Sequence, residues 1–234
     1  MTTSRIDGVL FDFSGTLLRV VPTDTWLRSA LDEAGLRLPE DEQRNLAEEL
    51  VHFGALPGGP APRALPAELE PLWRERDTTA ENHRAAYTAL IRRAGLPDPA
   101  LADLLYDRHL LPESWRPYPD AREVLDALRE AGVPVAVVSN VGWDVRPVFR
   151  AHGLDAGVGT YVLSFEHELQ KPAAGLFGVA CRALDRAPER VLMVGDDRVA
   201  DGGATALGCA LHLVDHLPVD ERPHGLRPVL DLVG

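Results

Sequence analysis

The sequence predicts an α/β fold, a doubly wound parallel sheet with an inserted α-helical cap domain. Five short runs rich in Val and Leu lack the alternation of half-exposed strands, which is typical of parallel strands buried on both faces. Amphipathic stretches lead into three of these runs, as repeated strand–helix–strand units require. A long helix-rich segment follows the first run and is far longer than the usual connection between such elements.

The five predicted strands cover residues 6–13, 133–139, 160–164, 191–194 and 210–214. Helices are predicted over 120–132, 145–153 and 174–186, where apolar residues recur every three or four positions and most stretches close with Gly. Parallel strands joined by such crossovers form a Rossmann-like layered sheet. We therefore assign residues 1–20 and 112–234 to a Rossmann-like core domain.

Residues 21–111 are predicted to form the helical cap domain. Its helices cover 23–35, 40–53, 78–95 and 98–110, and the first begins with Thr and Asp residues suited to capping. Residues 55–68 are rich in Pro and Gly, which predicts a loop. Four such helices are enough for a compact bundle beside the sheet.

The composition argues against several classes of function. With a formal net charge of −12 and a pI near 5.1, the 234-residue chain lacks the basic surface that binds nucleic acids or anionic membranes, so we expect neither as a partner. No basic segment precedes a long apolar run, so neither a targeting peptide nor a membrane span is expected. The only cysteines, Cys181 and Cys209, suit a reducing compartment and are expected to be free thiols. We expect a cytoplasmic protein, and the sequence leaves its oligomeric state open.

Polar residues stand where predicted strands end. The first strand ends near Asp12, the second at Ser139, and the fourth is followed closely by Asp196. Ligands of open α/β sheets bind outside the carboxyl ends of the strands, so these positions are candidates for a functional site. The loop after the third strand carries Lys171, the only lysine among 24 basic residues. Every other basic residue is arginine, so the single lysine indicates that this position needs a compact ammonium and not a planar guanidinium.

Four short segments contain these residues: FDFSGTL at 11–17, VVSN at 137–140, QKP at 170–172 and VGDDRVAD at 194–201. In type and order they resemble the four motifs of the haloacid dehalogenase superfamily. The resemblance extends over the whole chain and includes the helical cap that this family inserts between its first and second motifs. It implies a hydrolase in which Asp12 is the nucleophile, and in which Asp12, the backbone carbonyl of Ser14 and Asp196 hold Mg²⁺.

The chemistry of phosphoryl transfer explains these residue types. A carboxylate such as that of Asp12 attacks phosphorus and forms an acyl phosphate, which divides one difficult displacement into two easier ones. The repulsion between this carboxylate and a phosphate dianion has to be screened, and Mg²⁺ prefers carboxylate, carbonyl and phosphate oxygens. Ser139 is expected to donate its hydroxyl to the phosphate, and Lys171 to neutralise phosphate and nucleophile. Asp197 and Asp201 are predicted to lie behind the ligands, where Asp201 orients metal-bound water or Lys171.

Four further residues are predicted to contact the substrate or shape its site. Gly15 and Thr16 follow the nucleophile and allow a tight turn with a hydrogen bond across the site. Asn140 either touches the substrate or shapes the turn after Ser139. His83 is the preferred cap residue for an acid role, because imidazole titrates in the useful range. Other cap residues able to face the site are Trp26, Arg28, His52, Arg74 and Arg84.

Ser14 departs from the family pattern. Family phosphatases carry a second aspartate at this position, which protonates the leaving group and later activates water. Losing a general acid–base typically lowers a rate about 10²- to 10⁴-fold. Three explanations stay open: a leaving group that needs no proton, an acid from elsewhere such as the cap, or slow or absent catalysis.

The predicted function is Mg²⁺-dependent hydrolysis of a phosphorylated small molecule through an aspartyl-phosphate on Asp12. A metal-independent 2-haloacid dehalogenase is the enzymatic alternative, although such enzymes carry Tyr at the Ser14 position and Ser in place of Asp196. A weakly active or non-catalytic binding module on the same fold is the third possibility. Phosphonate cleavage through a cap lysine is disfavoured, because residues 21–111 contain no lysine.

Overall fold

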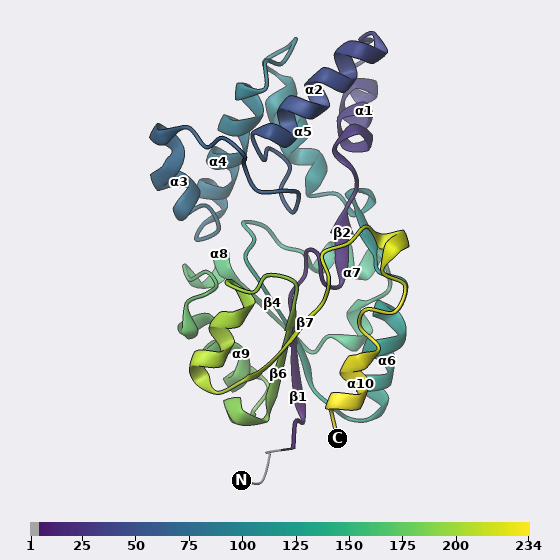
Figure 1. Cartoon of the computed structure of the whole chain (residues 1–234), viewed down its shortest axis with the longest axis vertical. Coiled ribbons are helices and arrows are strands. Elements are labelled where there is room, and N and C mark those ends of the chain that lie inside the picture. The colour runs from purple at the N-terminus through teal and green to yellow at the C-terminus, as the bar shows by residue number, and fades with distance from the viewer. Residues whose placement is uncertain (1–4) are drawn as a thin grey trace.

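The computed structural model describes residues 5–234 and confirms the predicted α/β fold with a helical insertion (Figure 1). The central sheet has five parallel strands in the order β5-β4-β1-β6-β7. These strands are β1 (Gly8–Phe11), β4 (Val135–Ser139), β5 (Thr160–Leu163), β6 (Val191–Gly195) and β7 (Ala210–Leu213). Residues 1–4, which the predicted core domain includes, lie outside the described residues.

The register of the sheet brings the predicted strand ends together. Phe11 of β1 pairs with Val137 of β4 and with Val194 of β6. The backbone N–H of Asp12 also donates to the carbonyl of Val194 at 2.9 Å, so the ordered main chain extends past the end of β1. Asp12, the end of β4 and the end of β6 therefore share one edge of the sheet.

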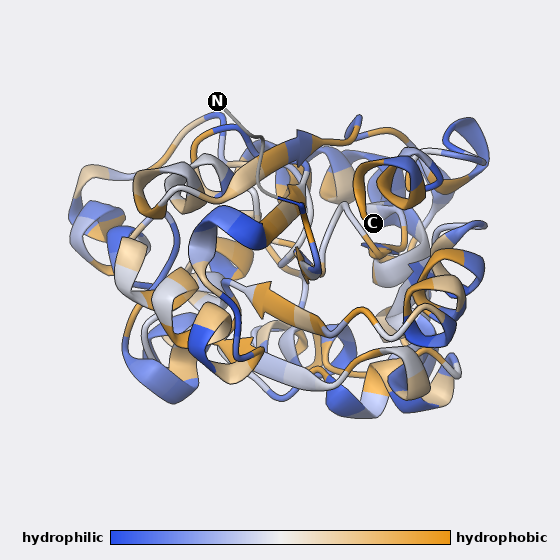
Figure 2. Cartoon of the chain, turned by 90° about the horizontal axis from the view of Figure 1, so that it is seen from below, coloured by the Kyte–Doolittle hydropathy of each residue, from blue (hydrophilic) through white to orange (hydrophobic). Residues whose placement is uncertain are grey.

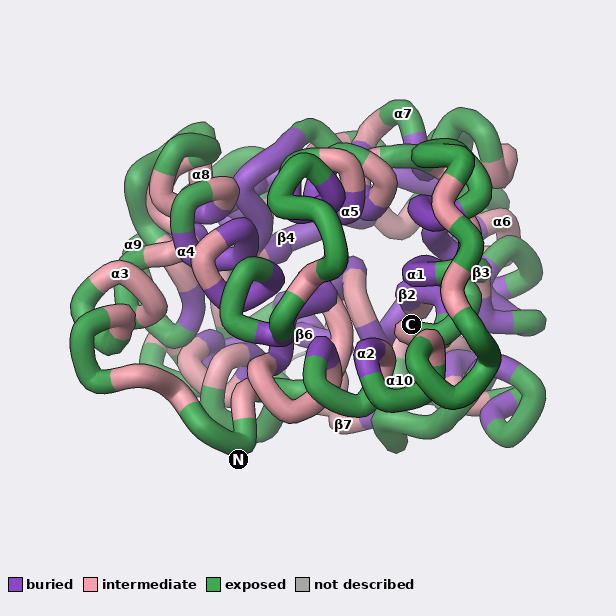
Figure 3. The backbone as a smooth tube through the Cα atoms, turned by 90° about the horizontal axis from the view of Figure 1, so that it is seen from above, coloured by how far each residue is buried: buried purple, intermediate pink, exposed green. Residues whose placement is uncertain are grey.

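Helices cover both faces of the sheet, which explains the unbroken apolar runs. Val9 and Phe11 of β1 belong to one buried cluster, whereas Leu10 between them belongs to a second cluster on the other face. The first cluster includes residues of α6 (Ala121–Glu130), and the second includes residues of α9 (Ala174–Ala183). Figure 2 shows the hydrophobic residues of the central strands, and Figure 3 shows these strands buried between helices with exposed outer turns.

Shorter elements complete the core. The remaining helices are α7 (Arg146–Ala151), α8 (Ser164–His167) and α10 (Pro228–Leu232). Short 3₁₀ turns are η2 (Pro112–Ser114), η3 (Asp155–Gly157), η4 (Pro188–Arg190), η5 (Asp201–Leu207) and η6 (Val219–Glu221). None of the helices within residues 5–234 is long and apolar enough to cross a bilayer. Cys181 and Cys209 are buried free thiols whose sulfur atoms lie 3.8 Å apart.

The insertion is a helical bundle above the strand ends (Figure 1). It contains α1 (Thr23–Glu33), α2 (Glu40–His52), η1 (Ala67–Leu69), α3 (Glu70–Arg74), α4 (Ala80–Arg93) and α5 (Leu101–His109). α1 packs against α2 and α5, and the buried indole of Trp26 donates to the carbonyl of Leu105 at 3.0 Å. The expected Thr or Asp cap of the first helix is wrong, because Pro22 holds the cap position and no side chain caps α1.

Two short strands join the insertion to the core. β2 (Leu18–Val20) and β3 (Trp115–Pro117) pair antiparallel, with Val20 opposite Trp115. The indole N–H of Trp115 donates to the carbonyl of His109 at 2.7 Å and so ties this ribbon to the end of α5. Strands of three residues are too short to show a hydrophobic period, so the sequence did not predict this ribbon. The domain boundaries at residues 21 and 111 stay a prediction.

A truncation on β1 tests the assignment of the sheet faces. Leu10 is fully buried against α9, so Leu10→Ala is expected to lower the free energy of unfolding by about 2–5 kcal/mol. Leu232→Ala, at a position 46% exposed in α10, is the control and should stay within about 0.5 kcal/mol of the native protein. Urea denaturation followed by circular dichroism measures both; equal effects would contradict the assignment.

Candidate functional site

Four predicted side chains meet at the carboxyl edge of the sheet. The ammonium of Lys171 donates to Asp12 Oδ1 at 2.7 Å and to Asp201 Oδ1 at 2.6 Å. The hydroxyl of Ser139, at the end of β4, donates to the same oxygen of Asp12 at 3.1 Å. All four side chains are buried. The structure therefore brings the strand ends and the loop lysine together around the Asp12 carboxylate.

Three acids form a cluster beside the lysine. One carboxylate oxygen from each of Asp12, Asp196 and Asp201 lies within 4.8 Å of the others. Asp196 directly follows β6, and Asp201 begins η5, where its second oxygen accepts the backbone N–H of Asp197 at 2.9 Å. Converging carboxylate oxygens are the donor set that Mg²⁺ and other hard divalent cations prefer. The residues present therefore fit a divalent metal ion.

The pKa values of Asp12 and Lys171 are both raised, for different physical reasons. Burial raises the pKa of Asp12 to about 7, and the neighbouring acids add to this rise while Lys171 opposes it. Burial alone would lower the pKa of Lys171, but Asp12 and Asp201 outweigh it and raise the pKa of the ammonium. The lysine therefore stays charged, and Asp12 is the group whose ionisation a further cation would favour.

The turn after Asp12 lies against the acid cluster. Gly15 has φ +86°, and a Cβ at this position would overlap the carboxylate of Asp196. The hydroxyl of Thr16 donates to Asp196 Oδ1 at 3.3 Å. Both residues therefore shape the acid cluster, and their contact with a substrate stays a prediction.

Asn140 holds the main chain of Lys171. Its side-chain amide donates to the carbonyl of Lys171 at 3.0 Å and its Oδ1 accepts the backbone N–H of Lys171 at 2.6 Å. Both polar groups of the side chain are thus engaged by the loop that carries the ammonium. This geometry supports the turn-shaping interpretation of Asn140 over direct substrate contact.

Ser14 and Asp197 make different contacts from the acids of the cluster. The hydroxyl of Ser14 donates to the carbonyl of Gly58 in the insertion at 3.4 Å. The carboxylate of Asp197 is exposed and accepts the backbone N–H groups of Val199 and Ala200 at 2.7 and 2.9 Å. Asp197 therefore shapes the loop between β6 and η5.

A cavity of about 650 Å³ lies between these residues and the insertion. Asp12, Ser139 and Lys171 line it from the core, and Arg76, Asp77 and His83 are among the residues that line it from the insertion. Of the six cap residues proposed from the sequence, His83 alone is in this lining. The other five lie elsewhere, as Trp26 does in the bundle core and Arg84 in its surface ion pair with Asp107.

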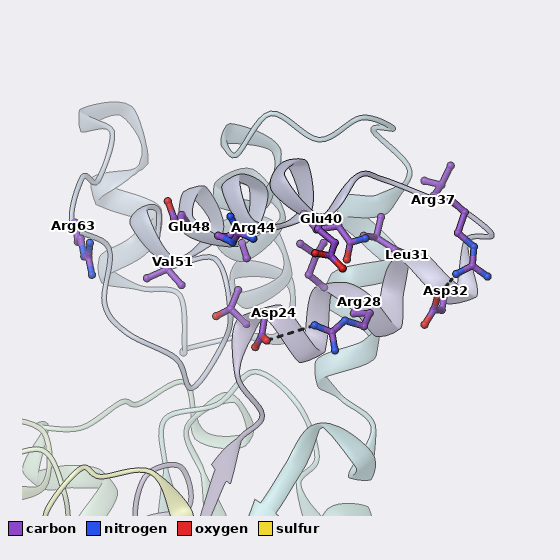
Figure 4. A pocket seen from close by; sticks show the side chains of 15 residues that line it. Asp24, Arg28, Leu31, Asp32, Arg37, Glu40, Arg44, Glu48, Val51 and Arg63 are labelled. Atoms are coloured by element: carbon purple, nitrogen blue, oxygen red, sulfur yellow. Dashed lines mark hydrogen bonds and ion pairs between the residues drawn. The ribbon is translucent and has the colours of Figure 1, made fainter.

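A larger hollow of about 930 Å³ lies in the insertion between α1 and α2 (Figure 4). Paired charges line it, including Arg28 with Asp24 at 3.8 Å and Arg37 with Asp32 at 3.4 Å. The strand-end residues described above are absent from its lining. The groups able to carry out chemistry therefore place the candidate active site in the smaller cavity.

Comparisons with known proteins agree with the fold described above. A family model described as haloacid dehalogenase-like hydrolase matches residues 6–206. The chain belongs to this family. It is 30% identical to ribulose-1,5-bisphosphate 5-phosphatase of Halopiger xanaduensis, over 89% of this chain and 84% of the relative. It is 26% identical to (S)-2-haloacid dehalogenase 4A of Burkholderia cepacia, over 68% of this chain and 74% of the relative.

Solved structures show the same fold. A crystal structure of a dehalogenase with an intermediate complex superposes with a TM-score of 0.70 over 98% of both chains, at 21% sequence identity. A structural match at this low sequence identity shows that the two proteins share a fold. The reaction of this haloacid dehalogenase-like hydrolase has to be argued from its site. Both phosphatases and dehalogenases occur among the relatives, so the comparisons do not decide between these two reactions. The residues able to bind a metal ion have to distinguish them.

The structure adds supporting residues that the sequence did not reveal. The buried guanidinium of Arg222 donates to the carbonyl of Gly15 at 2.7 Å and to that of Thr16, and it lies 3.2 Å from the ring centre of Tyr118. His216 hydrogen-bonds through Nδ1 to Asp196 Oδ2. These residues come from a C-terminal segment of little regular structure, where no periodicity or motif spacing singles them out.

Arg222 is expected to stabilise the turn beside the nucleophile. Arg222→Met leaves the buried carbonyls of Gly15 and Thr16 without this donor, which should cost about 1–3 kcal/mol for each. Arg227→Met is the matched control, because Arg227 makes an exposed ion pair with Glu123 that solvent screens, so its loss should change stability little. Chemical denaturation of both variants measures the difference; similar losses would show that Arg222 does not hold the turn.

Proposed function

We propose that this chain is a Mg²⁺-dependent phosphatase that acts on a phosphorylated small molecule through an aspartyl-phosphate on Asp12. The observation that carries the proposal is the convergence of the Asp12, Asp196 and Asp201 carboxylates within 4.8 Å. A reaction without metal gains nothing from three acids brought so close, since their mutual repulsion is unfavourable. The similarity to a phosphatase over 84% of that relative's length supports the same reaction class.

The residues divide the work of phosphoryl transfer. A carboxylate oxygen of Asp12 forms a bond to phosphorus, and the ester oxygen leaves with the electron pair of its bond. The Ser139 hydroxyl and the Lys171 ammonium, which now contact Asp12 Oδ1, are positioned to bind the oxygens of the transferred phosphoryl group. Asn140 keeps the ammonium in place through the Lys171 main chain.

Asp12, Asp196 and the backbone carbonyl of Ser14 would hold the metal ion. Mg²⁺ at this position supplies positive charge that screens the phosphate from the attacking carboxylate. Asp201 binds Lys171 directly and lies in the same acid cluster, so it balances the charge of the ammonium. We further propose that Ser14 stands where family phosphatases carry their second aspartate, and that the protein is cytoplasmic, which its free thiols support.

Metal-independent 2-haloacid hydrolysis is the second candidate. It is favoured by the relatives of that activity and by the lack of an acid at Ser14. In that reaction Asp12 would attack carbon and displace a halide, and the charge of Asp196 would have no role. Chloride release from 2-chloropropionate in the presence of EDTA would support it, and inactivity on both substrate classes would support a binding module.

Removing the nucleophile tests the phosphatase proposal. The native protein with Mg²⁺ should release nitrophenolate from p-nitrophenyl phosphate, and EDTA should abolish the release. Asp12→Asn is expected to reduce kcat/KM by about 10³-fold or more, because an amide oxygen does not attack phosphorus effectively. Absorbance at the nitrophenolate band measures all three.

Asp24→Asn provides the control for this substitution. Asp24 is exposed on α1 and pairs only loosely with Arg28, at 3.8 Å, so the variant should keep native activity. Mg²⁺-independent turnover, or full activity of Asp12→Asn, would overturn the proposed mechanism.

A further inference from the structure

The short segment before α4 brings a carboxyl group over the strand ends. The side chain of Asp77 is 4% exposed and lines the same cavity as Asp12 and Lys171. Arg76 Nη2 lies 3.2 Å from one oxygen of Asp77, and His83 Nε2 lies 3.8 Å from the other. Among the described residues, Asp77 is the carboxyl group that the insertion contributes to this cavity.

One contact fixes this segment to the loop that carries the lysine. The side-chain amide of Gln170, the residue before Lys171, donates to the backbone carbonyl of Arg74 at 2.5 Å. Arg74 ends α3 and lies three residues before Asp77. The segment with Asp77 is therefore held next to the Lys171 loop.

A second contact fixes the segment to the loop after Ser139. Gly142 lies so close to His83 that a Cβ at position 142 would overlap the side chain of His83. The other ring nitrogen of His83, Nδ1, lies 2.8 Å from the hydroxyl of Tyr106. Two core loops thus hold the region around Asp77 over the site, one through Arg74 and one through His83.

The two titratable groups of this segment differ in their fitness as proton donors. Burial lowers the pKa of His83 well below its ordinary value, so the imidazole is uncharged near neutral pH and is a poor proton donor. Burial raises the pKa of Asp77, although the charges of Arg76 and Lys171 oppose the rise. A carboxyl group that keeps its proton closer to neutral pH meets the requirement of a general acid.

On the basis of the proposed phosphatase function, we propose that Asp77 is its general acid–base, supplied by the insertion at a site where position 14 offers no carboxyl group. As Asp12 bonds to phosphorus, the departing ester oxygen keeps its electron pair and takes the proton of Asp77. The resulting carboxylate accepts a proton from the water that attacks phosphorus. The bond between phosphorus and Asp12 breaks, its electron pair returns to Asp12, and phosphate leaves.

Two esters of similar shape test this role. Phenyl phosphate has a more basic leaving group than p-nitrophenyl phosphate, whose phenolate leaves without a proton. Asp77→Asn is expected to lower kcat/KM for phenyl phosphate by about 10²-fold or more, while kcat/KM for p-nitrophenyl phosphate changes little. Hydrolysis of the aspartyl-phosphate then lacks its base, so stopped-flow absorbance should show a burst of nitrophenolate before a slower steady state.

Because both esters are measured on one sample, a partly unfolded variant cannot mimic a selective loss. Asp41→Asn, an exposed acid in the first turn of α2, is the matched control and should keep the native ratio. Asp77→Glu, which keeps the acid, should recover part of the phenyl phosphate activity, and His83→Gln should affect both esters alike.

Other outcomes overturn the proposal. Equal losses on both esters in Asp77→Asn, or no loss, would show that Asp77 gives no proton to the leaving group. A selective loss in His83→Gln alone would assign the proton to the imidazole. A native protein that hydrolyses neither ester with Mg²⁺ would overturn the proposed function itself, and the role of Asp77 with it.

Discussion

The site depends on the ammonium of Lys171 lying between the carboxylates of Asp12 and Asp201, at 2.7 and 2.6 Å. With Asp196 in the same cluster, three carboxylates and one ammonium leave two negative charges in excess when all are ionised. Two unit charges 4.8 Å apart repel by about 3–4 kcal/mol at an effective dielectric constant of about 20. Burial is the main cause of the raised pKa of Asp12, and the repulsion from Asp201 and Asp196 adds to it, so a divalent cation at the cluster would relieve part of the same cost.

The fold holds these charges together by fixing main chain as well as side chains. Parallel register aligns the ends of β1, β4 and β6, but Lys171 comes from a loop and needs separate support. Asn140 supplies it with two hydrogen bonds to the Lys171 main chain, and Arg222 supplies comparable support to the turn after Asp12. Each charged group is therefore positioned before a ligand arrives, which lowers the reorganisation that catalysis would require.

The core of the site could be predicted from the sequence because the sheet fixes it. Asp12, Ser139 and Asp196 stand beside buried strands, so apolar patterning places them at one edge. Lys171 could be singled out because it is the only lysine.

The cap could not be predicted in the same way. Helical periodicity shows that a helix has a buried face but not which partner the face meets, and five of the six candidate cap residues lie outside the cavity lining. Asp77 stands in a short turn without a period, and Arg222 in a segment with little regular structure, so tertiary packing alone brings them to the site.

The identity of residue 14 and the course of the cap loop are coupled by space. The Ser14 hydroxyl donates to the carbonyl of Gly58 at 3.4 Å, and a Cβ at position 58 would lie only 2.7 Å from that hydroxyl oxygen. Gly58 also has φ +77°, which disfavours any other residue there. Because residue 14 has a small side chain and residue 58 has none, the loop around Gly58 can pack against the turn that follows Asp12. A longer acidic side chain at position 14 would have to displace this loop. The packing of the loop over the cavity therefore favours a proton donor that comes from the insertion, where Asp77 lies.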